Sequence, residues 1–151
     1  MQLNDPWLKN RPEYDILART LWAETRSEGK VGMRAVAAVI MNRVNLDLNN
    51  DNKPDWWGEG VIGVCLKPWQ FSCWNDNDPN LSKLKAVTEK DIHFKAAIDI
   101  AKDAITKNGI FPDPVFGSTH YLVDSWIPKT KWARDNKALV KIGRHVFYRL
   151  T

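Results

Sequence analysis

The chain has 151 residues, 44% of them hydrophobic and 26% charged, which is typical of one folded domain with room for a substantial core. No stretch approaches the roughly 20 uninterrupted apolar residues of a membrane-spanning helix, so stable membrane insertion is not expected. The net charge of +4 favours anionic partners, but it fits ordinary solubility equally well.

The first predicted helix covers residues 14–26. Leu17, Leu21, Glu24 and Glu28 follow one another at spacings of four, three and four, which places them on one helix face. Glu24 therefore continues a stripe of leucines, where a carboxyl group costs free energy to bury unless its proton is used. Glu24 is the leading catalytic candidate.

A second helix is predicted to begin near Gly32 and to end at Asn42 and Arg43. Two neighbouring stripes of mainly apolar residues follow the helical period, so most of the circumference is apolar. This pattern predicts a central helix that other helices enclose.

From Asn45 to Pro79 the helical period is lost, and we expect a long irregular lobe with at most one small strand, at Val61–Leu66. Four of the eight tryptophans lie in this lobe. Tryptophan stacks on sugar rings and nucleobases, but it also fills cores, and for each one taken singly packing is the better interpretation.

Thr88 and Asp91 have the spacing of a capping box, and the helix that follows is predicted to end at Asn108 and Gly109. Residues 118–123 and 142–150 are rich in β-branched and aromatic residues and predict two short paired strands. The sequence thus predicts an α+β fold, mostly helical, as a single domain over residues 1–151.

Glu24 and Glu28 lie one helical turn apart, so repulsion between them would raise the pKa of one carboxyl group if both are partly buried. Protonating a glycosidic oxygen needs such a group. The alternative is structural: Glu28 is an exposed residue at a helix end, and Glu24 forms a salt bridge with Arg43 or Arg26.

Five short segments, in this order and spacing, resemble the cell wall hydrolases of the spore-cortex-lytic SleB/CwlJ type: residues 23–28 (AETRSE), 42–44 (NRV), 70–74 (QFSCW), 118–121 (STHY) and 143–148 (GRHVFY). The resemblance implies a lysozyme-like domain related to lytic transglycosylases, which cleaves the β-1,4 bond between N-acetylmuramic acid and N-acetylglucosamine. Glu24 matches the family's catalytic glutamate, and bacterial peptidoglycan is the implied partner.

The resemblance also implies a set of residues that bind the substrate or support the site. Gln70, Ser72, Thr119 and Tyr121 would hydrogen-bond to the sugars, and Phe71 would cover a sugar face. Glu28 is one candidate to position a water molecule in a hydrolytic reaction. Further candidates for contacts in the cleft or behind it are Asn42, Arg43, His120 and His145.

The sequence departs from the family pattern in two ways. The usual Glu-Ala-Arg-Gly-Glu is Glu24-Thr25-Arg26-Ser27-Glu28 here, which keeps the charged positions and replaces the two small residues. No signal peptide is visible, so we expect a phage-type endolysin, made in the cytoplasm and released through a holin, or a virion-borne enzyme acting on the cell wall. We expect a monomer that does not bind nucleic acid.

No cofactor or metal is expected, because His120, His145 and the two cysteines, Cys65 and Cys73, lack the spacing of metal-ligand motifs. Without a secretion signal the cysteines are expected to remain thiols. One rival interpretation is a wall peptidase or amidase with Cys73 as nucleophile and His120 or His145 as base. Another is a non-catalytic, tryptophan-rich module that binds glycan or nucleic acid.

Overall fold

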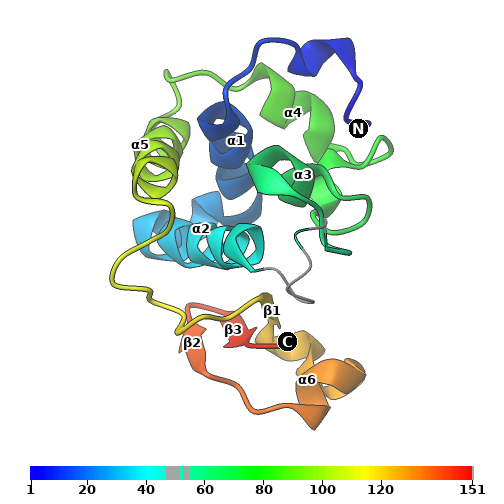
Figure 1. Ribbon diagram of the computed structural model, residues 1–151, viewed down its shortest axis with the longest axis vertical. Coiled ribbons are helices and arrows are strands. Elements are labelled where there is room, and N and C mark those ends of the chain that lie inside the picture. Colours follow the sequence, from blue (N-terminus) through cyan, green and yellow to red (C-terminus); the bar gives the residue numbers. More distant parts are fainter. Residues whose placement is uncertain (47–51, 53–54, 151) are drawn as a thin grey trace.

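The computed structural model describes residues 1–46, 52 and 55–150, which form a large helical lobe and a smaller lobe around a sheet (Figure 1). The helices are α1 (Glu13–Thr25), α2 (Gly29–Asn45), α3 (Gly60–Leu66), α4 (Asn80–Ala86), α5 (Ile92–Lys107) and α6 (Lys131–Asp135). The strands are β1 (His120–Val123), β2 (Val140–Ile142) and β3 (His145–Tyr148). Short 3-10 helices cover Pro6–Leu8, Arg26–Glu28, Ser72–Trp74 and Asp124–Lys129. The predicted α+β class with a mostly helical chain is confirmed.

Helix α1 lies at the centre of the helical lobe and packs against α2, α3, α4 and α5 (Figure 1). Ile16, Leu17 and Leu21 are fully buried there, as the helical period predicts. The helix ends at Thr25, close to its predicted end. Since Glu24 lies in the last turn, the core packing of α1 fixes the position of its side chain.

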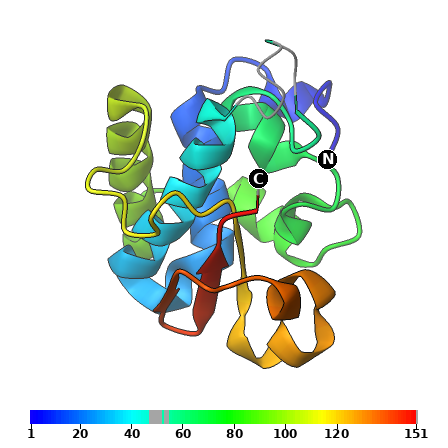
Figure 2. The same ribbon diagram turned by 60° about the horizontal axis from the view of Figure 1, so that its bottom comes forward.

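Helix α2 begins at Gly29, three residues before the predicted start at Gly32. The 3-10 turn over Arg26–Glu28 leads into Gly29, whose φ of 72° lies in the left-handed region that favours glycine. The prediction of an enclosed central helix is confirmed, because a continuous run from Ala35 to Met41 is buried. In Figure 2 the sheet lobe comes forward, and α2 lies beside it.

The segment 45–79 is more regular than the sequence predicted. Val61–Leu66 belongs to helix α3 and not to a strand, since Val61, Val64 and Cys65 are buried at spacings of three and one while the residues between them are partly exposed. Helix α4 follows and was not predicted, because it is short and buries only Leu84. Residues 47–51 and 53–54 of the predicted irregular lobe lie outside the described residues.

Helix α5 has the predicted C-terminal stop, with Asn108 in a left-handed conformation at φ 55°. Its start differs from the prediction: the N-cap is Asp91, whose side chain accepts hydrogen bonds from the backbone N–H groups of His93 and Phe94. The capping box was therefore wrong, since Thr88 accepts from the N–H of Lys90 instead. Asp91 itself satisfies the unpaired N–H groups of the first turn.

The sheet is antiparallel, in the order β1-β3-β2, and the predicted pairing of the two longer strands is confirmed. Tyr121 faces Phe147 and Val123 faces His145 in its register. The short β2 was not predicted. Ala133, Val146 and Tyr148 form a small separate core under α6, which gives this lobe packing of its own.

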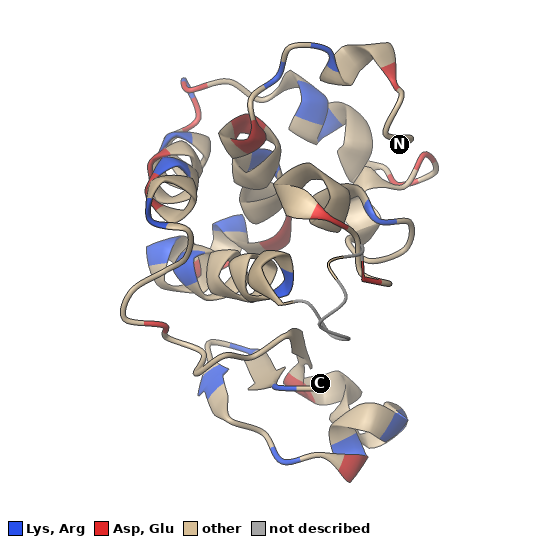
Figure 3. Cartoon of the chain, viewed as in Figure 1, with Lys and Arg blue, Asp and Glu red and all other residues tan. Residues whose placement is uncertain are grey.

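Within the described ranges, the helices are all too short or too polar to cross a bilayer. Basic and acidic residues are distributed over both lobes (Figure 3).

Candidate active site

A pocket of about 350 Å³ lies where the two lobes meet. Glu24 and Arg43 come from the ends of α1 and α2, residues 69–72 come from the segment after α3, and the sheet contributes Tyr121, Leu122, Val123 and His145. The volume is within the usual range for a pocket that binds a small ligand. Residues almost 100 positions apart in the sequence thus line one site.

Glu24 is the one carboxyl group among the described residues that line this pocket. Burial raises its pKa from 4.5 to about 7, and hydrogen bonds from the Cys73 thiol and the Tyr121 hydroxyl counteract part of that rise. The hydroxyl of Tyr121 donates to Oε2 of Glu24 over 3.5 Å. At neutral pH a large fraction of Glu24 therefore carries its proton, as a general acid requires.

Glu28 lies beyond the end of α1, so it does not extend the helical stripe that carries Glu24. Its Oε2 is 2.8 Å from Nδ1 of His145, and its side chain fills the space between Gly32 and Gly143. A Cβ at Gly143 would lie 3.4 Å from the Glu28 carboxyl carbon. The predicted repulsion was wrong, because burial raises the pKa of Glu24 and the smaller charge effect on it comes from Asp78. The alternative of an exposed Glu28 is also wrong, since its side chain is 18% exposed.

Arg43 lines the pocket without forming the salt bridge to Glu24 that the structural alternative required. Its Nε donates to the carbonyl oxygen of Thr119 over 2.6 Å, and its guanidinium lies near the rings of Trp57 and Phe71. Burial lowers the pKa of Arg43 to about 10, so it stays positively charged at neutral pH. Arg26, the other candidate partner, hydrogen-bonds to the carbonyl oxygen of Trp22.

The predicted segment 70–72 reaches the pocket with all three of its residues. Gln70 uses its amide nitrogen to bond to the carbonyl oxygens of Trp57 and Val64, which holds the segment in place. Phe71 is buried against the helical core, and Ser72 is exposed. Ser72 is thus the residue of this segment whose hydroxyl is open to a ligand.

Four predicted site residues lie outside the lining of the pocket: Glu28, described above, and Asn42, Thr119 and His120. Asn42 donates to a carboxylate oxygen of Asp113 and to the carbonyl oxygen of Ser118, and so ties the end of α2 to the segment before β1. The fully buried Thr119 hydroxyl accepts from the N–H of Leu150. His120 packs among Trp56, Trp57 and Trp132, and burial lowers its pKa to about 4.

Three residues that line the pocket were not individual candidates from the sequence: Trp69, Leu122 and Val123. Leu122 and Val123 follow the predicted Tyr121 on β1 and carry no chemical signal of their own. Trp69 lines the pocket with a side chain that is 79% exposed, and its φ of 67° is unusual for a residue with a side chain. The clustering of tryptophans was the signal available for it, but that clustering does not distinguish an exposed ring from a buried one.

The two cysteines are free and buried, so they form no disulfide in this structure. Burial raises the pKa of Cys65 to about 12 and that of Cys73 further, with the Glu24 charge adding to the effect on Cys73. A thiol held in its neutral form is a poor nucleophile. In the part of the chain that the structure describes, no three His, Cys, Asp or Glu side chains are grouped as metal ligands.

The family described as Cell Wall Hydrolase matches residues 27–148, well over half of the chain, and the chain belongs to that family. The family resemblance inferred from the five segments is thereby confirmed. Glu24 lies just before the matched range, so the assignment of its role depends on its place in the pocket.

Relatives and solved structures agree with this membership. A spore cortex-lytic enzyme from Halalkalibacterium halodurans is 29% identical over 140 residues, and one from Bacillus cereus is 30% identical over 139 residues. Each match covers 89% of this chain, which spans 34% and 43% of the lengths of these relatives.

Two solved catalytic domains have a similar fold. The domain of the germination-specific lytic transglycosylase SleB from Bacillus anthracis aligns with a TM-score of 0.61 and 24% identity, over 92% of this chain and 97% of that one. The SleB catalytic domain from Bacillus cereus aligns with a TM-score of 0.57 and 26% identity, over 92% of each chain. Their fold matches the helical lobe with a small antiparallel sheet described above.

Proposed function

We propose that this chain is a peptidoglycan-degrading glycosidase that cleaves the β-1,4 bond between N-acetylmuramic acid and N-acetylglucosamine, with Glu24 as general acid and base. The observation that carries the proposal is one carboxyl group with a pKa raised to about 7, at the edge of a pocket between two lobes. Membership of the cell wall hydrolase family and the names of its relatives support the choice of substrate.

The reaction begins when Glu24 donates its proton to the glycosidic oxygen and the bond from that oxygen to the muramoyl C1 breaks. The N-acetylglucosamine unit leaves with a free 4-hydroxyl group. Ionised Glu24 then takes the proton of the muramoyl 6-hydroxyl group, and the oxygen of that hydroxyl group bonds to C1. The products are a 1,6-anhydromuramoyl end and a regenerated carboxylic acid.

The lining of the pocket favours this intramolecular route over attack by a second carboxylate. Retaining glycosidases that form a covalent intermediate need two carboxyl groups about 5 Å apart. Among the described lining residues Glu24 has no carboxylate partner, and the nearby Glu28 is bonded to His145. An internal hydroxyl as nucleophile removes the need for such a partner.

Mass analysis of digested peptidoglycan tests the proposal. Purified peptidoglycan is incubated with the protein, and the soluble fragments are separated. Mass spectrometry of each fragment then identifies its terminal sugar. We expect 1,6-anhydromuramic ends. Reducing ends would support a glycosidase that uses water instead, and released peptides with intact glycan chains would overturn the proposal.

The alternative, a wall peptidase or amidase with Cys73 as nucleophile, predicts that substitution of Cys73 abolishes wall lysis. We expect Cys73→Ser to retain wall lysis within about tenfold of the wild type, since a serine hydroxyl can replace the thiol as donor to Glu24. Turbidity of a wall suspension measures the rate. Cys65→Ser, at the other buried thiol, is the matched control. Loss of lysis in Cys73→Ser alone, with an unchanged melting temperature, would support the peptidase or amidase.

A further inference from the structure

A second pocket, of about 290 Å³, lies beside the Glu24 pocket and shares Trp69 with it. One stretch of chain lines both: residues 69–72 line the Glu24 pocket, while Lys67, Pro68, Trp69 and residues 74–77 line the second one. Trp69 therefore stands on the boundary between the two.

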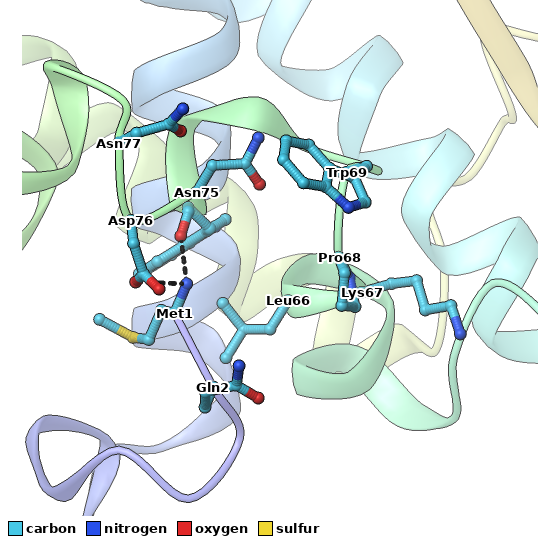
Figure 4. Close-up of a pocket in the computed structure, with 10 residues that line it drawn as sticks. Met1, Gln2, Leu66, Lys67, Pro68, Trp69, Asn75, Asp76 and Asn77 are labelled. Carbon is cyan, nitrogen blue, oxygen red and sulfur yellow. Dashed lines mark hydrogen bonds and ion pairs between the residues drawn. The ribbon is translucent and has the colours of Figure 1, made fainter.

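The side chains in the second pocket are those that bind sugars. Figure 4 shows Trp69 on one side of the pocket and Asn75 and Asn77 on the other. An indole face covers the apolar face of a pyranose ring, and a primary amide offers two donors and an acceptor to hydroxyl and acetamido groups. The ring of Trp69 is 79% exposed, so it is available for stacking.

The amide groups in this pocket are also available. Within residues 1–46, 52 and 55–150, the side chains of Asn75 and Asn77 make no hydrogen bond to the protein, in contrast to Gln70, whose nitrogen is used twice. The acidic residue between them is occupied: Asp76 forms an ion pair with the amine of Met1 over 3.1 Å, drawn as a dashed line in Figure 4. The Asn75 and Asn77 amides are therefore free to hydrogen-bond to the hydroxyl and acetamido groups of a glycan ring, and the exposed Lys67 lines the same pocket.

We propose that the second pocket is a distal saccharide subsite of the same cleft, in which Trp69 stacks on the glycan chain where it leaves the Glu24 pocket and Asn75 and Asn77 hydrogen-bond to the next N-acetylated sugar. This inference rests on the proposed function, since it assigns a further part of the same substrate. The subsite makes cleavage dependent on the length of the glycan chain.

Cleavage of peptide-free glycan chains of two lengths tests the subsite. The wild type and an Asn75→Ala/Asn77→Ala variant act on chains of four and eight sugars prepared from peptidoglycan. We expect kcat/KM on the longer chain to fall at least fivefold in the double variant, with the value on the shorter chain within twofold of the wild type. Trp69→Ala should lower both values, roughly tenfold to a hundredfold on the longer chain, because its ring borders both pockets.

Trp126→Ala is the matched control, because Trp126 is an exposed tryptophan, 58% accessible, that lines neither pocket. Its kinetics should equal those of the wild type on both chains. Equal activity of the double variant and the wild type on the longer chain would overturn the proposal. So would an equal loss on both lengths, which indicates general damage, or a loss confined to peptide-bearing chains, which indicates a peptide site.

A binding measurement separates failure of the subsite from failure of the proposed function. Glu24→Gln protein labelled with 15N is titrated with a hexamer of N-acetylglucosamine, and the side-chain amide signals of Asn75 and Asn77 are followed. Saturable shifts of both signals support the subsite whether or not the wild type cleaves peptidoglycan. Unmoved signals, with cleavage by the wild type intact, overturn the subsite and leave the proposed function standing.

Discussion

Glu24→Gln is expected to lower wall lysis by roughly 10³-fold or more, because the amide keeps the shape of the side chain and has no proton to transfer to the glycosidic oxygen. Residual lysis is measured as the fall in turbidity of a purified wall suspension. Glu89→Gln, at an exposed carboxylate remote from the pocket, is the control and should act like the wild type. Lysis by Glu24→Gln within tenfold of the wild type would reject Glu24 as the proton donor.

The same variant should be at least as stable as the wild type at alkaline pH. The pKa of Glu24 is about 7 in the folded chain and 4.5 in the unfolded chain, so the folded state holds the proton more tightly. The resulting stability is present below pH 4.5 and is lost as the pH rises through 7. At pH 8 the wild type should therefore be less stable than Glu24→Gln by about 3 kcal/mol at most, measured by urea unfolding. At pH 4 the difference should vanish.

Glu28→Ala is expected to have the second largest effect, on stability and activity together. It leaves Nδ1 of His145 without its partner and opens the space between Gly32 and Gly143. The free energy of unfolding should fall by about 1–3 kcal/mol. The His145 ring packs edge-on against Tyr121, which donates to Glu24, so we expect kcat to fall roughly tenfold to a hundredfold with a smaller change in KM.

Glu28→Gln serves as the conservative comparison, because its amide fills the same space and can still hydrogen-bond to His145. It should recover most of the stability and much of kcat. If Glu28→Ala instead lost as much activity as Glu24→Gln while remaining folded, Glu28 would act in the chemistry, as a residue that positions water. If kcat were unchanged in a destabilised protein, the Glu28 contact would be structural only.

The sequence predicted α1, α2 and the candidacy of Glu24 because long helices with a strong apolar period leave little choice of structure. The run from Val61 to Leu66 was different. Six apolar or small residues without a clear period fit a strand as well as a helix, and packing against α1 and α2 decided for the helix. The intrinsic helix or strand preference of these residues was too weak to predict the helix.

The site prediction was wrong for one of two neighbouring residues on β1, His120 and Tyr121. Side chains alternate between the two faces of a strand, so His120 and Tyr121 point in opposite directions. The sequence indicated both, and the fold brings Tyr121 to Glu24 and packs His120 among tryptophans. Likewise the position of Glu28 depends on the turn at Gly29 and on its contact with His145 in the other lobe. Helical spacing alone predicts neither of these features.

Titration of the Glu24 carboxyl carbon by NMR tests the central claim most directly. Protein labelled with 13C at glutamate side-chain carboxyl groups is followed from pH 3 to pH 9, and the Glu24 signal is identified by its absence from Glu24→Gln. The account predicts a midpoint near pH 7, since burial at the pocket disfavours the charged form. A midpoint near 4.5, the ordinary value for glutamate, would contradict it.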